Sequence, residues 1–231
     1  MKQQSKMTER IKKLTVIGMF AALAYVLHFI HIPVGFLNLD FKDVVMAVAG
    51  MYFGPIAGLT LSILVPLLEF PTGSTGVYGL LMNIVSSSAF VGTASLIYRF
   101  KKTLSGAIIS LCSAVLAMTA IMMLANLWIT PYYMGVQIEA VAAMIPTTLL
   151  PFNAIKAILN AALTLCLYKP MTVLLRKNGF GKQGSAQSNT ENMDPSLLRR
   201  RTVLVAVVGG MIAVIALCII FFVMGGTIAF F

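Results

Sequence analysis

The chain has 231 residues, a mean hydropathy of +0.92 and only 10% charged residues. Soluble globular domains carry about a quarter charged residues, so this composition excludes that class and indicates an integral protein of the lipid bilayer. The net charge of +10 does not indicate nucleic-acid binding, because the basic residues gather at the ends of apolar segments, as membrane topology signals do.

Apolar segments as long as a membrane helix recur along the chain. The first, at about 14–32, follows a basic segment, 1–13, and continues without a convincing signal-peptide cleavage site, so it predicts a membrane helix. None of the apolar segments alternates apolar and polar residues as the strands of a membrane barrel do. The expected fold class is therefore all-α, with further spans at about 78–98, 104–128, 149–168 and 203–231.

The segment 44–68 fits either one long span or a hairpin of two shorter helices, about 41–53 and 55–70, broken at Gly54 and Pro55. The distribution of positive charge decides between them. With a hairpin and a cytoplasmic N terminus, three basic groups all fall on the cytoplasmic side: the five residues before Leu14, the three from Arg99 to Lys102, and the seven from Lys169 to Arg201. A single span would place the last two groups outside, so the hairpin is favoured.

The hairpin completes a six-helix membrane core over 14–177 with its N terminus in the cytoplasm. A linker, 178–201, follows; it is rich in Gly, Ser, Asn and Gln, and we expect it to be a flexible cytoplasmic segment. An additional seventh transmembrane helix within 202–231 then leads outward and places the C terminus outside. An accessory anchor is favoured for this helix over a functional element.

Polar residues occur in the outer half of the predicted sixth helix. In "LPFNAIKAILN", Asn153, Lys156 and Asn160 stand at i, i+3 and i+7 and share one helix face. A lysine at this depth is costly without a partner, water or a polar ligand, which favours a functional site. The alternative is that Lys156 snorkels outward or forms a structural ion pair with Glu139 or Glu69.

Two asparagines on other helices lie at a similar predicted depth. Asn126 lies near the outer end of the fifth helix, and Asn83 lies in the first turns of the fourth. Because a carboxamide both donates and accepts hydrogen bonds, these residues suit the edge of a heteroaromatic ring. For Asn83, an interhelical hydrogen bond is an equally good interpretation.

Two further places supply candidate ligand contacts. The loop "GFLNLDFKDV" after the first helix contains Leu39 and Asp40 and could close over a ligand, while Asp43 can cap the next helix. Tyr132 completes the candidate set, although an interfacial aromatic belt is the favoured interpretation for Trp128, Tyr132 and Tyr133.

Motifs of catalysis and metal binding are missing from the sequence. It has no phosphate-binding loop, zinc-protease motif or nucleophile elbow, so we expect neither an enzyme nor a cofactor, and an energy source must come from a partner. The three cysteines lie in apolar runs without metal-ligand spacing. His28 and His31 lie near the outer end of the first helix, where interfacial placement is favoured over metal binding.

Several motifs in order carry a family resemblance: "LDFKDV" after the first helix, "FGPIAG" at the hairpin break, "ANLW" and "PYYMG" near the end of the fifth helix, and "LPFNAIKAILN" in the sixth. Over about Lys12 to Lys177 the chain resembles the substrate-binding S components of energy-coupling factor (ECF) vitamin transporters. It is most similar to their riboflavin-specific branch.

The resemblance implies a function and a set of partners. An S component in the bacterial cell membrane captures a vitamin from outside, in a pocket between the outer halves of helices four to six and the loop after helix one. An ECF transmembrane coupling protein and two ATPase subunits then drive delivery. Riboflavin would be the ligand, with Asn126, Asn153 and Lys156 hydrogen-bonding the polar edge of its ring. The coupling protein would dock at small residues of helix one, here Gly18 and Ala22.

Two alternatives stay open. The chain could be an S component for a different vitamin or a nucleobase-like compound. It could also be a non-transport membrane assembly protein whose polar residues form only interhelical hydrogen bonds. The linker and seventh helix depart from the six-helix core of the family.

Overall fold

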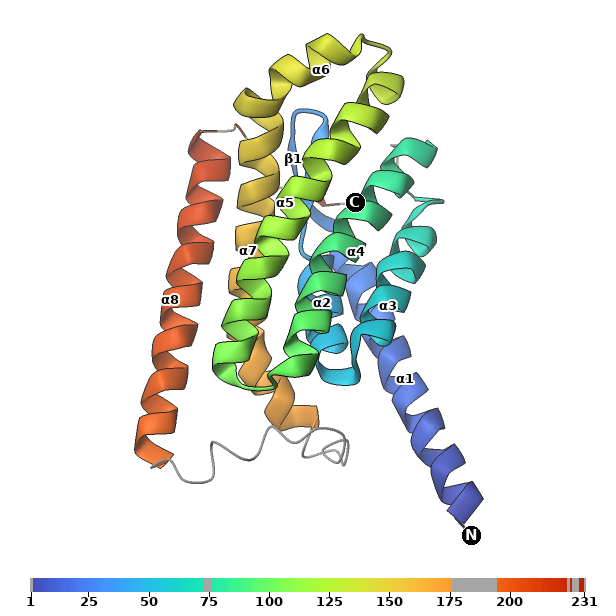
Figure 1. Ribbon diagram of the computed structural model, residues 1–231, viewed down its shortest axis with the longest axis vertical. Helices are drawn as coiled ribbons and strands as arrows, with labels where there is room; N and C mark the ends of the chain where they lie inside the picture. The colour runs from blue at the N-terminus through green and yellow to red at the C-terminus, as the bar shows by residue number, and fades with distance from the viewer. Residues whose placement is uncertain (1, 73–75, 176–194, 224, 226–228, 231) are drawn as a thin grey trace.

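The computed structural model describes residues 2–72, 76–175, 195–223, 225 and 229–230 (Figure 1). Its long helices lie side by side as a bundle, and a small sheet lies near one end. The helices are α1 (Lys2–His28), α2 (Lys42–Phe53), α3 (Pro55–Glu69), α4 (Gly76–Phe100), α5 (Leu104–Met134), α6 (Ile138–Met144), α7 (Leu150–Leu175) and α8 (Pro195–Phe222), with a π-helical turn at Ile145–Leu149 between α6 and α7. The strands are β1 (Ile30–Val34), β2 (Leu37–Asp40) and β3 (Ala229–Phe230).

The helical lengths agree with a membrane protein. Within the described part of the chain, five helical segments are long and apolar enough to cross a bilayer. These are Ile11–His28, Gly76–Phe100, Leu104–Met134, Ile138–Leu174 and Val203–Phe222. The last predicted span is shorter than expected, since α8 ends at Phe222 and the chain forms β3 near residue 230. The predicted linker at 178–194 lies outside the described residues, and residues 195–201, expected to be linker, begin α8.

The predicted break between the second and third helices is present. Gly54 separates α2 from α3 with φ 105° and ψ 167°, a conformation that only glycine adopts readily, and Pro55 occupies the first turn of α3. The two helices approach closely, because a Cβ on Gly50 would lie 3.0 Å from the Cα of Gly58. Ten of the twelve residues of α2 are buried, so this helix forms the centre of the bundle.

A sheet was not predicted, and it replaces the end of the first expected helix. The helix ends at His28 instead of near residue 32, and β1 and β2 form an antiparallel hairpin with Val34 opposite Leu37. Gly35, with φ 61°, takes the first position of the two-residue turn, as short hairpins favour. Strand β3 pairs antiparallel with β1, giving the order β2-β1-β3. Hydropathy missed the change because the sequence stays apolar from the helix into β1.

Two apolar clusters hold these elements together. The larger cluster joins α1, α2, α4 and α5 through fully buried side chains such as Met46, Phe90 and Met118. The smaller one joins the β1–β2 hairpin, α7 and α8 through Leu39, Leu159 and Ile220. The hairpin is thus fixed against α7 and α8 above the centre of the bundle.

Candidate ligand-binding cavity

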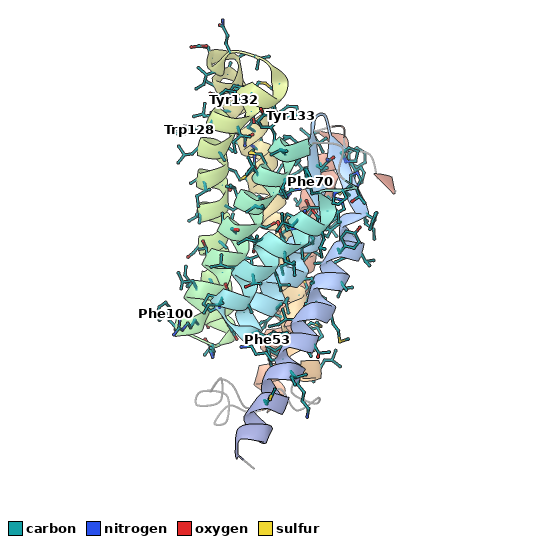
Figure 2. All side chains as sticks on the ribbon, turned by 90° about the vertical axis from the view of Figure 1, so that its right-hand side faces the viewer. Phe53, Phe70, Phe100, Trp128, Tyr132 and Tyr133 are labelled. Carbon is teal, nitrogen blue, oxygen red and sulfur yellow. The ribbon has the colours of Figure 1, made fainter. Side chains whose placement is uncertain are left out.

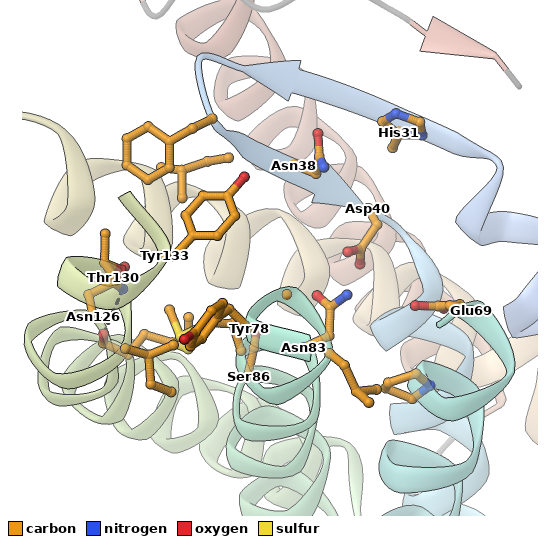
Figure 3. A pocket seen from close by; sticks show the side chains of 18 of the residues that line it. His31, Asn38, Asp40, Glu69, Tyr78, Asn83, Ser86, Asn126, Thr130 and Tyr133 are labelled. Carbon is orange, nitrogen blue, oxygen red and sulfur yellow. Dashed lines mark hydrogen bonds between the residues drawn. The ribbon is translucent and has the colours of Figure 1, made fainter. Parts of the chain in front are cut away.

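A cavity of about 220 Å³ lies between the β1–β2 hairpin and α3, α4, α5 and α7. Five of the sequence-predicted site residues line it: Asp40, Asn83, Asn126, Asn153 and Lys156. Figure 3 shows Asn126 and Thr130 on one side and Asp40 and Glu69 on the opposite side. The site therefore brings together polar residues from segments more than a hundred positions apart in the sequence, separated by apolar lining such as Met82, Met122, Ile129 and Phe152.

The hairpin places its polar and apolar side chains on opposite faces. Successive strand residues point to opposite sides, so Asn38 and Asp40 reach the cavity while Leu39 points into the smaller apolar cluster. Leu39 is fully buried there, with Ile32 as its partner on β1. The structure therefore does not place Leu39 at the cavity, although the sequence analysis grouped it with Asp40.

Lys156 forms an ion pair with Asp40 at the edge of the cavity. Its Nζ lies 3.1 Å from Asp40 Oδ2 and donates to the carbonyl oxygen of Asn38 at 3.4 Å. The side chain is only 5% exposed, so it does not snorkel, and its carboxylate partner differs from the two that the sequence analysis considered. Asp40 Oδ1 is buried without a hydrogen-bond partner among the described residues, and it remains available as an acceptor.

A second buried ammonium lies beside the first pair. Lys42, which is 1% exposed, forms an ion pair with Glu69 Oε2, and its Nζ lies 3.8 Å from Asp40 Oδ2. His28 Nδ1 lies 3.5 Å from the same Glu69 oxygen. Glu69 lines the cavity, and its Oε1 has no partner within the described ranges. Sequence reasoning missed Lys42 as a candidate, although a lysine between apolar segments is a signal in its own right.

The two predicted asparagines on α5 and α7 are held by their own helices. Asn126 is fully buried; its Nδ2 donates to the Met122 carbonyl at 2.7 Å, and its Oδ1 accepts from Thr130 Oγ1 at 2.9 Å. Asn153 Nδ2 donates to the Leu149 carbonyl at 2.8 Å. These bonds orient both amides, and each amide keeps hydrogen-bonding capacity for a ligand.

Asn83 differs from the other two asparagines. No hydrogen bond joins its side chain to another residue that the structure describes, so the interhelical hydrogen bond considered above is not observed there. Figure 3 shows the Asn83 amide between Tyr78 and Glu69, on the α4 side of the cavity. Its donor and acceptor atoms are therefore available in this part of the site.

Of the two adjacent tyrosines near the end of α5, Tyr133 lines the cavity and Tyr132 does not. The side chain of Tyr132 is 75% exposed and lies near Trp128, which is 77% exposed, toward the α6 end of the bundle (Figure 2). Since each helical residue turns by about 100°, the neighbouring Tyr133 faces the cavity instead. Asn126, Thr130 and Tyr133 stand at i, i+4 and i+7, a spacing that could have identified this face.

Asn160 and Asp43 form a separate polar connection below the cavity. Ser87 Oγ donates to Asp43 Oδ1 at 2.6 Å, and Asn160 Nδ2 donates to Asp43 Oδ2 at 3.5 Å. Asp43 does not cap α2, whose N-cap residue is Phe41 without a side-chain bond. The connection joins α2, α4 and α7 and supports the floor of the site.

The predicted docking residues on α1 lie on an open surface. Gly18 and Ala22 are both exposed, and a Cβ on Gly18 would meet nothing within 4 Å. A partner helix could therefore approach the α1 backbone there, and the docking role remains a prediction.

Comparison with known proteins gives the family. Residues 12–168 match the family model described as the ECF transporter, substrate-specific component. The chain belongs to this family. An S component of this kind is a non-catalytic, substrate-binding subunit of a membrane transporter.

The S component also has characterised relatives. It is 31% identical over 176 residues to the riboflavin transporter RibU of Staphylococcus aureus (strain TCH60), covering 72% of this chain and 93% of the relative. It is 27% identical over 163 residues to the riboflavin transporter FmnP of Bacillus subtilis (strain 168), covering 64% of this chain and 86% of the relative. A solved structure of the S component of a bacterial ECF transporter superimposes with a TM-score of 0.63 at 30% identity, covering 72% of this chain and 99% of that one.

Proposed function

We propose that this S component binds riboflavin and delivers it inward with an ECF transmembrane coupling protein and two ATPase subunits. The observation that carries the proposal is the cavity, in which Asn126, Asn153 and Lys156 converge from two helices. The resemblance assigns these residues to the polar edge of the flavin ring. Two relatives that match this chain over 93% and 86% of their own lengths are named riboflavin transporters.

The chemistry of the cavity suits a flavin. A ring with carbonyls and ring nitrogens along one edge can accept from the amides of Asn126 and Asn153, while its apolar faces rest on apolar lining. Asp40 Oδ1 and Glu69 Oε1, which have no hydrogen-bond partner among the described residues, can each accept from a ligand, and riboflavin supplies an imide N–H and several hydroxyl groups. A ligand without such donors would leave buried acceptors unsatisfied, at a cost of about 1–3 kcal/mol each.

The arrangement of the bundle supports capture from outside. The start of α1, the α4–α5 turn and the end of α7 lie at one end, and the hairpin and α6 lie at the other (Figure 1). The first of these ends carries the described basic residues Lys12, Lys13, Arg99, Lys101 and Lys169, so the positive-inside rule assigns it to the cytoplasm. The cavity then opens in the outer half of the bilayer, and the exposed small residues of α1 are available to the coupling protein.

Riboflavin fluorescence tests the proposal directly. Purified protein should quench riboflavin fluorescence on binding. Asn153→Leu should weaken binding by more than about tenfold, because it removes a buried, uncharged amide that can hydrogen-bond the ligand. Ile158→Ala, a change at a partly exposed position on the same helix, is the matched control and should bind normally.

A panel of ligands separates the alternatives. Thermal stabilisation by thiamin, biotin or a nucleobase, without stabilisation by riboflavin, would keep the S-component role and replace the vitamin. Stability that responds to none of these compounds, together with normal vitamin uptake after deletion, would favour a non-transport membrane assembly protein.

A further inference from the structure

The chain continues beyond the region that it shares with its relatives. The family model matches residues 12–168, and almost the whole of the solved S component is covered by 72% of this chain. Helix α8 and strand β3 follow that region. Both contact the β1–β2 hairpin, which forms one wall of the cavity.

Helix α8 contacts the apolar face of the hairpin. Ile32 and Leu39 of the hairpin belong to one buried cluster with Ile220 of α8, and Leu39 and Ile220 are both fully buried. Ala213 and Ala216 belong to the same cluster, and these small side chains allow α8 to approach α7 closely. Figure 1 shows α8 running alongside α7 toward the level of the hairpin.

Strand β3 contacts the same hairpin through its backbone. It pairs with β1, with Phe230 opposite Ile30 and Ala229 opposite His31. Without β3, the outer edge of β1 would present unpaired backbone groups, and a two-stranded hairpin is only marginally stable alone. The third strand therefore stabilises the hairpin from the side opposite β2.

The hairpin couples these contacts to the ligand site. Because strand residues alternate, the strand that presents Leu39 to α8 presents Asp40 to Lys156 on the other face. Without the α8 contact, the hairpin could move back into the space that α8 fills, which would carry the Asp40 carboxylate away from Lys156 and open one wall of the cavity.

We infer that α8 and β3 form a brace that holds the β1–β2 hairpin closed over the cavity and thereby slows ligand exchange. Ile220 is the principal positioning residue of this brace. The brace itself is independent of ligand identity, and only the choice of riboflavin as the kinetic probe rests on the proposed function.

Two measurements on the full chain test the brace. In Ile220→Ala, hydrogen exchange of the hairpin amides, 30–40, without ligand should be at least about tenfold faster, because the hairpin opens more often. The same variant should release riboflavin at least about fivefold faster, with little change in the association rate. Ile220→Leu, which keeps the apolar volume, should retain slow exchange and slow release.

Matched variants separate the brace from general loosening. Cys166→Ala removes the contact between Cys166 Sγ and the Ala206 carbonyl, 3.4 Å, which joins α7 and α8 away from the hairpin. Ile215→Ala changes a side chain of α8 that is 56% exposed. Both should leave hairpin exchange and riboflavin release unchanged, and equal acceleration in Cys166→Ala would overturn the inference.

The strand contact has its own variant. The double variant Ala229→Pro, Phe230→Pro replaces both residues of β3. Because proline has no backbone N–H, the N–H that donates to β1 is lost whichever of the two residues carries it. Faster exchange in the hairpin is expected. If Ile220→Ala does not fold, this variant and Ile220→Val carry the test. Unchanged hydrogen exchange of the hairpin amides in these variants would overturn the inferred brace. If hydrogen exchange is faster but the protein does not bind riboflavin, only the proposed vitamin is overturned.

Discussion

Lys156 and Asp40 show how one ion pair can serve both folding and binding. Their contact at 3.1 Å is buried, and Asp40 keeps one oxygen without a partner among the described residues. Breaking a buried pair on one side leaves an uncompensated charge, whereas replacing both charges costs much less. The two roles can therefore be separated by single and double substitutions.

Lys156→Met should lower the thermal midpoint and weaken riboflavin binding by more than about tenfold, because it removes a donor and the nearer of the two ammonium groups beside Asp40. Adding Asp40→Asn should restore most of the thermal stability and leave binding weak. Thermal unfolding and fluorescence titration of both variants provide the check. Full binding in the double variant would show that Lys156 does not contact the ligand.

Lys42 is expected to matter for stability more than for binding. Lys42→Met leaves Glu69 buried without its ammonium, which should cost about 3–5 kcal/mol and lower the thermal midpoint strongly. Lys12→Met, at an exposed position of α1, is the control and should leave the midpoint unchanged. A similar midpoint for both variants would mean that Glu69 is solvated or paired elsewhere.

The sequence identified several residues that line the cavity, but it did not identify their partners or the direction of every side chain. Hydropathy and periodicity identified Asn126, Asn153 and Lys156, which line the cavity. The partner of Lys156 lies 116 positions away, so only tertiary structure could identify it. Tyr132, which the sequence predicted as a contact, points away from the cavity that Tyr133 lines, because a shift by one residue on a helix changes the direction of a side chain by about 100°.

At the scale of elements, α2 and α3 are held together by glycine contacts. Gly58→Ala would place its Cβ 3.0 Å from Gly50 Cα and 3.0 Å from Val91 Cγ1, and the backbone neighbour cannot move aside. The two helices must then separate, at a cost of about 1–3 kcal/mol. Thermal unfolding should show the loss, while Gly210→Ala on α8, where a Cβ meets nothing within 4 Å, should be neutral. Equal midpoints would mean that the helices are less tightly packed.

Element boundaries were predictable where composition changes along the chain. The Gly54–Pro55 break and the long spans follow from breakers, charge and hydropathy. The β1–β2 hairpin was missed because its strands continue the apolar run of α1 and their burial alternates only in the folded state. Strand β3 was missed because its pairing with β1 depends on a segment about two hundred positions away.

At the scale of the whole molecule, the proposed orientation assigns the cavity end of the bundle to the outside. In a background lacking the native cysteines, Gln137→Cys, between α5 and α6, should react with a membrane-impermeant maleimide on intact cells. Lys101→Cys, in the α4–α5 turn, should react only after permeabilisation. Both positions are exposed in the structure, so a difference in labelling between them reports the side of the membrane and not burial of the side chain. The opposite labelling pattern would contradict the assigned orientation.

Helix α3 has a consequence for the surrounding lipid. Its fifteen residues span about 22 Å, less than the hydrocarbon thickness of about 30 Å, yet one side exposes Ile56, Leu59, Ile63 and Leu67. The bilayer beside this face must become thinner, through less extended or tilted acyl chains, to match the length of α3. The protein would then carry a locally thinned annulus on one flank, and its stability after reconstitution should rise as phospholipid chains become shorter.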